Sequence, residues 1–248
     1  MEVIKKANTK LDAVLIGIRY QRSWSLLDKT GEIIDKILRD KKSPFAQDSD
    51  YFTKVGGNEK EIGRVLINPD TGCSLQININ DLIFKHVLNK HIKEVSKKNL
   101  SWFFSTIIKF IIPEIIVYYK IKQIMRVGIV YYHYVDVKDI SMEFINKAFG
   151  DNPGEITKFN LDFHKKYIAE IAIAKKGVSD YKNAIYNIKN KNNKYEISLD
   201  YQYYFEPYND HLEDWNANIF IESSQRYLED IFYPWLKKIF INLNIKES

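Results

Sequence analysis

The chain has 248 residues, of which 45% are hydrophobic and 14% aromatic, so it can bury a sizeable core and is not a disordered protein. Its 37 basic and 32 acidic residues leave a formal net charge of +5, a mild excess that does not indicate a strong nucleic-acid binder. The single cysteine, Cys73, excludes an intramolecular disulfide and a cysteine-based zinc site.

Two features predict a cytoplasmic protein without membrane contact. Residues 1–6 lack the apolar segment and cleavage site of a secretory signal. Residues 102–119 are strongly apolar, but Lys109 and Glu114 would sit near the middle of a membrane span. This stretch is therefore predicted to be a buried core helix.

The first half begins with a strand over residues 10–20 that is apolar on nearly both faces, which is typical of a central strand. Ser23 is a candidate N-cap for a following amphipathic helix, and residues 40–50 are predicted to form a loop. A hairpin is predicted over residues 62–79, with its turn at residues 68–72.

A long helical region follows, over about residues 89–119, in which Pro113 should kink or interrupt the helix. The second half then opens with another candidate central strand, residues 126–135. The predicted elements after it are a short helix (141–149), strands (157–164, 167–174, 181–188 and 195–205) and a closing helix that starts near residue 210 and is broken by Pro234.

The two central strands carry similar segments, Gly17-Ile18-Arg19-Tyr20 and Gly128-Ile129-Val130-Tyr131. With the order of elements, this match predicts an α+β fold in which two pseudo-repeated strand-helix-antiparallel-sheet-helix halves, residues 1–120 and 121–248, form one compact body. The alternative is coincidence, because strand-then-helix units are common and the matching segment is short.

The second copy also carries a resemblance, over Arg126-Val127-Gly128-Ile129-Val130-Tyr131-Tyr132-His133-Tyr134-Val135-Asp136. This segment resembles a sporadically distributed family of uncharacterised bacterial proteins with an Arg-apolar-Gly-apolar-Arg-Tyr-apolar-Asn-Arg-apolar-Asp strand. Arg126, Gly128, Tyr131 and Asp136 match the motif. Val130, His133 and Tyr134 replace its second Arg, its Asn and its third Arg. The resemblance covers nearly the whole layout but implies no activity.

Polar residues alternate along several of the late strands and define a candidate binding surface. Asp162 and His164 share one strand face. With Glu196 and Asp200 on a second strand and His133 and Asp136 on a third, they form a candidate constellation of titratable side chains. The favoured interpretation of such alternation is the wet side of a sheet. The candidate surface comprises Arg19, Arg126, Tyr132, Tyr134, Asp162, His164, Asp200 and Tyr204.

Basic residues also crowd one stretch that the pattern predicts to be helical, which makes them candidate phosphate contacts. They are Lys85, Lys90, Lys93, Lys97 and Lys98. The favoured interpretation is nevertheless a soluble helix with lysines on its outer face.

No catalytic, metal-binding or cofactor-binding motif occurs, so the sequence favours a non-enzymatic binding or assembly protein without a cofactor. The surface tyrosines favour a protein partner or self-association, because tyrosine is enriched at interfaces. The family's patchy distribution suggests an accessory component of a bacterial mobile or antiviral-defence locus. The alternatives are a nucleic-acid-binding protein that uses a basic helix and a curved sheet, and a small-ligand sensor or enzyme at Asp162 and His164.

Overall fold

A computed structural model describes most of the chain. The described residues are 7–41, 43–45, 49–55, 61–88, 100–121, 123–135, 160–168, 181–191, 194–209, 216–239 and 243–245.

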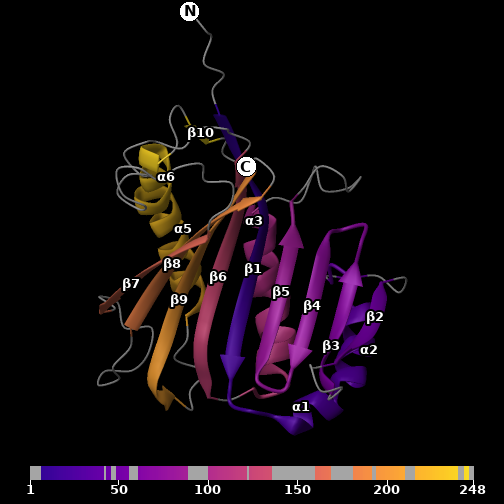
Figure 1. The fold of residues 1–248 in the computed structure, drawn as a ribbon. Helices are drawn as coiled ribbons and strands as arrows, with labels where there is room; N and C mark the ends of the chain where they lie inside the picture. The colour runs from indigo at the N-terminus through magenta and orange to yellow at the C-terminus, as the bar shows by residue number, and fades with distance from the viewer. Residues whose placement is uncertain are drawn as a thin grey trace, which may run out of the picture.

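One ten-stranded sheet forms the body of the protein, in the order β2-β3-β4-β5-β1-β6-β9-β8-β7, with β10 paired to β1 (Figure 1). All its pairings are antiparallel except β1 with β10. The strands are β1 (Ala7–Tyr20), β2 (Asp50–Val55), β3 (Glu61–Asn68), β4 (Cys73–Asn78), β5 (Asp81–Val87), β6 (Ile124–Val135), β7 (Asn160–Ile168), β8 (Tyr181–Lys191), β9 (Lys194–Asn209) and β10 (Leu243–Ile245).

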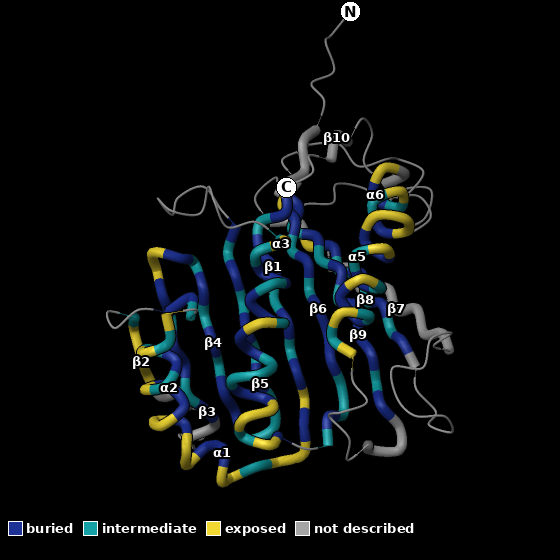
Figure 2. The backbone as a smooth tube through the Cα atoms, turned by 180° about the vertical axis from the view of Figure 1, so that it is seen from behind, coloured by how far each residue is buried: buried dark blue, intermediate teal, exposed yellow. Residues whose placement is uncertain are grey.

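The described helices all lie against one face of this sheet, as the view from behind shows (Figure 2). They are α1 (Trp24–Asp28), α2 (Thr30–Arg39), α3 (Leu100–Thr106), the π-helix η2 (Ile107–Val117), α5 (Ala217–Tyr227), the π-helix η4 (Leu228–Phe232) and α6 (Tyr233–Ile239). The predicted α+β class is therefore confirmed, with a large antiparallel sheet and helices on one side.

The core lies between the helices and the sheet, and the period-two pattern of the strands decides which residues enter it. In β1, Val14, Ile16 and Ile18 are fully buried, while Arg19 is exposed on the other face. Phe103 of α3 stacks on Phe84 of β5, with ring centroids 5.2 Å apart. Apolar side chains on one face of the sheet thus hold the helices in place.

Strands β1 and β6 meet at the centre of the sheet in a regular antiparallel register. Gly17 is paired with Gly128, and Arg19 with Arg126 on one side of the glycines. Leu15 pairs with Val130 on the other side. The other edge of β1 pairs with β5, and the other edge of β6 with β9, so in each half the first strand lies beside the last strand of the meander that follows.

Several local predictions are confirmed. The Ser23 hydroxyl accepts a hydrogen bond from the Leu26 N–H and caps α1. The hairpin joins β3 to β4, and Gly72 takes a φ of 67°, the left-handed conformation that its turn needs. Both predicted central strands are central, because β1 and β6 pair with each other.

Three strands, β2, β5 and β10, were not predicted, and the first two corrections have a physical reason. Lys85 and His86 of β5 were counted with the basic helical stretch, because they interrupt the apolar pattern of the strand. His86 is in fact completely buried on the helix-covered face. β2 lies at the edge of the sheet, where Tyr51 and Phe52 are both exposed, so its sequence carries no alternation.

Neither proline ends its helix. Pro113 lies inside η2, and the helix continues past it with π-type geometry, so it is not interrupted there, while the kink stays a prediction. Pro234 was expected to break the closing helix, but α5, η4 and α6 follow one another without a gap, and Tyr233 is in the α-helical conformation. Pro234 therefore lies directly after a π-helical turn within one continuous helical segment.

Other predictions fall partly or wholly outside the described residues. The strands predicted over residues 157–164 and 167–174 are represented by the single strand β7, with the remainder undescribed. The helix at 141–149 lies outside the described residues, as does the part of the long helix before Leu100.

One described helix, Leu100–Val117, is long and apolar enough to cross a membrane by length and composition alone. In the structure Phe103, Ile107 and Ile111 of this helix belong to the core beside the sheet. The Glu114 carboxylate pairs with the Lys36 ammonium at 2.8 Å, which ties η2 to α2. This packing is that of a core helix.

Two glycines make a matched pair for a stability test. A Cβ on Gly63 would come 2.1 Å from Asn78 Oδ1 and 2.7 Å from the Ile77 carbonyl oxygen. A Cβ on Gly31, in α2, would meet nothing within 4 Å. We expect Gly63→Ala to lower the free energy of unfolding by about 1–3 kcal/mol through overpacking, and Gly31→Ala to raise it by about 0.5–1 kcal/mol. Urea unfolding measures both, and equal effects of the two would contradict this account of the β3–β4 contact.

Candidate binding groove on the open face of the sheet

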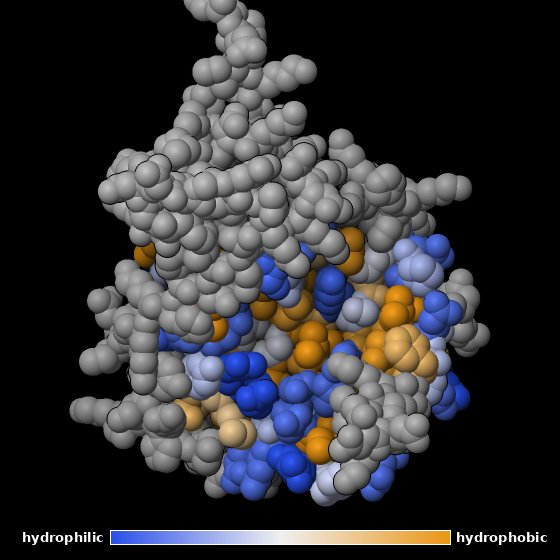
Figure 3. Space-filling view, viewed as in Figure 1, coloured by the Kyte–Doolittle hydropathy of each residue, from blue (hydrophilic) through white to orange (hydrophobic). Residues whose placement is uncertain are grey.

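The face of the sheet opposite the described helices carries a groove of about 220 Å³ over its central strands. Figure 3 shows this face, with apolar side chains at the centre of the view and hydrophilic ones below and to the left. The groove is lined by Leu15, Gly17, Ile18, Arg19, Asp81, Ile83, Arg126, Gly128, Val130 and Asp200. It therefore lies where β1, β5, β6 and β9 run side by side.

The paired glycines at the middle of the groove leave two neighbouring positions without side chains. A Cβ on Gly17 would meet no described heavy atom within 4 Å, whereas a Cβ on Gly128 would lie 3.2 Å from Asp200 Oδ1 and 3.5 Å from Gln202 Cγ. Within the described part, Gly72 is the only glycine with a positive φ, so the conformation of Gly17 suits any residue. Neither space nor backbone geometry explains why Gly17 is a glycine.

Two arginines form one end of the groove. Arg19 is paired in register with Asp81 on β5 and with Arg126 on β6. Like charges directly opposite each other destabilise a strand pair, so the arginine pair does not serve the sheet itself. The Arg126 guanidinium lies over the Tyr204 ring, 5.7 Å from its centroid, and its Nη1 donates to the Tyr204 hydroxyl at 3.3 Å.

A chain of hydrogen bonds continues from Arg126 along β9 to the other end of the groove. The Tyr204 hydroxyl donates to Gln202 Oε1 at 3.0 Å, and Asn183 Nδ2 donates to the same oxygen at 3.2 Å. Gln202 Nε2 in turn donates to Asp200 Oδ2. The chain therefore runs from a cation to an anion and orients the side chains that form this wall.

The charges that line the groove balance, because it contains two arginines and two aspartates. The Asp81 carboxylate accepts a hydrogen bond from Asn78 Nδ2. Between the charged ends Ile83 lies beside the glycines, and the apolar Leu15 and Val130 lie in register with Asp200. Such a surface suits a ligand that carries charges of both signs around an apolar centre.

Polar residues extend the open face beyond the groove. The Lys85 ammonium lies 5.8 Å from the centre of the Tyr132 ring. Burial raises the pKa of the Tyr132 hydroxyl, with a further contribution from Asp200. The Tyr134 hydroxyl donates to Glu196 at 2.9 Å, and this hydrogen bond raises its pKa to about 12. These hydroxyls stay protonated near neutral pH and can act as donors.

The register places six residues of the predicted binding surface on the same open face of the sheet, namely Arg19, Arg126, Tyr132, Tyr134, Asp200 and Tyr204. Tyr204 pairs with Arg126, and Asp200 with Val130, across the β6–β9 pair. Asp162 and His164 pair with Asn187 and Ile185 of β8, so one strand separates them from β9. The predicted set is Arg19, Arg126, Tyr132, Tyr134, Asp162, His164, Asp200 and Tyr204, and its role in binding stays a prediction.

His133 does not join the polar constellation with which it was grouped. It is completely buried on the helix-covered face of β6, where its Nε2 lies 3.2 Å from the Tyr233 hydroxyl. Asp136, grouped with it, lies outside the described residues. The alternation of β6 explains the correction, because His133 shares the parity of the buried Tyr131 rather than that of Tyr132.

The predicted phosphate contacts are also corrected in part. Lys85 belongs to strand β5, where it is paired with Leu15 of β1, and not to a helix. The other four, Lys90, Lys93, Lys97 and Lys98, lie outside the described residues. A single helical stretch that carries all five lysines is therefore excluded.

Among the described residues, no group of three or more His, Cys, Asp or Glu side chains is arranged to hold a metal ion. Cys73 is a buried thiol beside His86, with Sγ 3.5 Å from Nδ1. The described part thus offers no arranged metal site.

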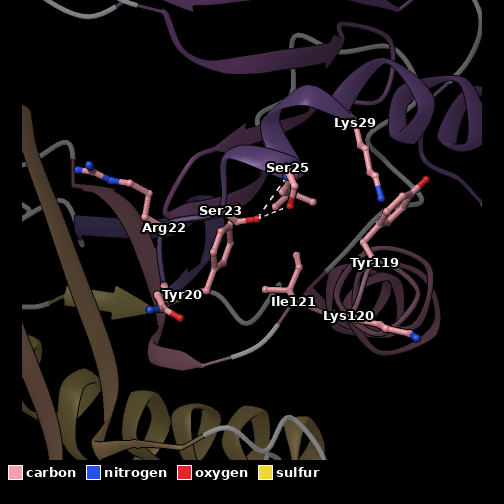
Figure 4. A pocket seen from close by; sticks show the side chains of 10 residues that line it. Tyr20, Arg22, Ser23, Ser25, Lys29, Tyr119, Lys120 and Ile121 are labelled. Atoms are coloured by element: carbon pink, nitrogen blue, oxygen red, sulfur yellow. Dashed lines mark hydrogen bonds between the residues drawn. The ribbon is translucent and has the colours of Figure 1, made fainter.

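A second pocket, also of about 220 Å³, lies where the end of β1 and the start of α1 meet the end of η2 (Figure 4). Arg22, Lys29 and Lys120 line it, but Figure 4 shows the Arg22 and Lys120 side chains turned away from its centre. The Tyr20 hydroxyl already donates to the Asn78 and Asp81 carbonyl oxygens. We therefore regard the groove on the open face as the better candidate site.

Sequence reasoning identified Arg19, Arg126 and Asp200 but not their neighbours in the groove. Asp81 and Ile83 were missed together with strand β5, and Gln202 was not among the predicted site residues. Asp200, Gln202 and Tyr204 are two residues apart along one strand, and this spacing indicates that all three lie on the same side of the groove. No family model and no curated protein matches the chain.

Proposed function

We propose that the protein is a non-enzymatic binding or assembly protein, and that the groove on the open face of its sheet receives a protein partner. The observation that carries this proposal is Gly17. It lies in the middle of a central strand, where glycine costs about 0.5–1 kcal/mol relative to alanine, and it fulfils no need of the fold. A glycine inside a strand often marks a place where a ligand or another backbone approaches closely.

The charge balance of the groove favours a protein partner over a nucleic acid. Phosphate backbones bind along paths of lysine and arginine side chains. Here Asp81 lies beside Arg19 and Asp200 lies at the other end of the groove, and both carboxylates would repel a polyanion. A protein surface can present both signs of charge together with apolar side chains.

We further propose that the two halves arose by internal duplication. The relation that superimposes Gly17 on Gly128 also brings Tyr20 onto Tyr131, and the order of strands within each half agrees with it. The halves differ in the groove, because Arg19 corresponds to Val130. The proposed site is accordingly asymmetric, with both arginines at one end.

Site-specific photo-crosslinking in the native host tests the proposed function. A photoreactive residue at Ile83 lies in the groove, and one at Glu222, exposed on α5, is the matched control. We expect a discrete protein adduct from position 83, none from position 222, and loss of the adduct when Gly17→Leu fills the groove. A nuclease-sensitive adduct would instead support the nucleic-acid alternative. Absence of any adduct from position 83, or equal adducts from both positions, would contradict the proposal.

A further inference from the structure

The residues of the groove form three successive rows across the sheet. The first row holds Asp81, Arg19 and Arg126, the second holds Ile83 and the two glycines, and the third holds Lys85, Leu15, Val130 and Asp200. Asp81 lies on the far side of Arg19 from Arg126, and the Lys85 ammonium lies over the Tyr132 ring, so the space between the two arginines and the space beside Asp200 stay available to a ligand. Residues on one face of a strand are two positions apart, and each position advances about 3.3 Å, so the first and third rows lie about 13 Å apart. An extended peptide has the same repeat.

We propose, building on the proposed function, that the partner inserts an extended segment with the pattern acidic, any residue, small apolar, any residue, basic. The acidic side chain binds between Arg19 and Arg126. The small apolar side chain lies over Gly17. The basic side chain reaches Asp200.

The arginine end is organised to bind a carboxylate. Arg126 is already oriented by its ring contact and hydrogen bond with Tyr204. Within the described part, Arg19 makes no hydrogen bond or ion pair. Planar guanidinium groups bind carboxylates through paired, charge-assisted hydrogen bonds. A carboxylate between the two arginines would also relieve the repulsion between them.

The other end is organised to bind a cation. Asp200 is oriented by Gln202, which is itself held by Asn183 and Tyr204. Leu15 and Val130 lie next to Asp200 in the same row and offer apolar surface to the stem of a lysine or arginine. The carboxylate then receives the charged head of that side chain.

The middle row sets the size of the central residue. Gly17 leaves open space above the sheet, and Ile83 lies beside it in register on β5. Gly128 contributes less space, because Asp200 and Gln202 lean over it. A valine or alanine side chain fits this depression, whereas a large aromatic side chain would have to displace the wall on β9.

Fluorescence-anisotropy titrations with short labelled peptides test the pattern. The reference peptide is Glu-Ser-Val-Ser-Lys, with Glu-Ser-Val-Ser-Glu, Lys-Ser-Val-Ser-Lys and the altered spacing Glu-Val-Ser-Lys as comparisons. We expect the reference peptide to bind most tightly. Arg126→Gln should weaken it about tenfold or more, because charge-assisted hydrogen bonds are lost. Arg22→Gln, which alters an exposed arginine outside the groove, should leave binding unchanged.

A charge reversal makes the test specific. Asp200→Lys should weaken the reference peptide about tenfold or more and make the doubly acidic peptide the preferred ligand. Equal binding of all four peptides to the unaltered protein, or preference for the doubly acidic one, would overturn the pattern. If none of the peptides binds but the photo-crosslinked adduct from position 83 persists, the proposed sequence pattern is refuted and the binding function is not. Loss of that adduct as well would refute the binding function.

Discussion

The free energy of unfolding should fall by several kcal/mol when the protein is brought from pH 7 to pH 4, and His133 should account for much of the loss. Burial lowers the pKa of His133 from 6.5 to about 3. An unfolded chain takes up a proton at this histidine below about pH 6.5, whereas the folded protein keeps it neutral until about pH 3. The unfolded state then binds more protons, so stability is lost as the pH falls through this range.

The packing of His133 explains why it cannot easily take up the proton. Its ring lies among Phe232 and Tyr233, with centroids 5.8 and 5.6 Å away, and the effect of burial on its pKa outweighs that of a hydrogen bond with the Tyr131 backbone, which favours the protonated form. Each pH unit below 6.5 should cost about 1.4 kcal/mol at this site, down to about pH 3.

Urea unfolding of the wild type and His133→Leu at several pH values isolates this contribution. Carboxylates titrate in both proteins, so the difference between the two curves reports His133. We expect the slope of stability against pH to be smaller in His133→Leu by about one proton between pH 6 and pH 4. Parallel curves would show that His133 is protonated as readily in the folded protein as in the unfolded chain.

Filling the groove should abolish binding without loss of the fold. Gly17→Leu places a side chain in a space where a Cβ meets no described atom, and a leucine suits a strand flanked by Leu15 and Ile83. We expect the photo-crosslink at Ile83 and the affinity for the reference peptide to fall at least tenfold, because the side chain takes the volume needed by the ligand.

The control for this substitution is stability measured on the same sample. Gly17→Leu should unfold at the same urea concentration as the wild type or a higher one, and its circular dichroism should be unchanged. A protein that has lost its fold also loses binding, so the stability of each variant must be known. Gly63→Ala is the useful comparison, because the fold does need a glycine at position 63. Retained binding with an intact fold would place the ligand elsewhere.

The two central strands were predictable, because period-two alternation is strongest where a strand is buried. Residues 10–20 and 126–135 were assigned on that ground, and their shared Gly-Ile-x-Tyr segment placed both glycines in strands. The pairing of Gly17 with Gly128 was not predictable, since register depends on contacts between segments far apart in the chain. Only the register shows that the two glycines make one depression.

The charged ends of the groove were predictable only in part. Arg19, Arg126 and Asp200 were identified as polar residues on the wet face of strands. Asp81 was not identified, because His86 interrupts the apolar pattern of β5 and the strand was therefore not predicted. Burial of His86 and His133 against aromatic rings is a tertiary effect that no local pattern contains.

The most direct measurement is the free energy of unfolding of Gly17→Ala beside that of the wild type. The central claim is that Gly17 is kept for a ligand and not for the fold. It predicts that alanine stabilises the protein by about 0.5–1 kcal/mol, since glycine is costly within a strand and the Cβ meets only open space. Destabilisation by a similar amount would show that the sheet itself requires this glycine, and would contradict the claim.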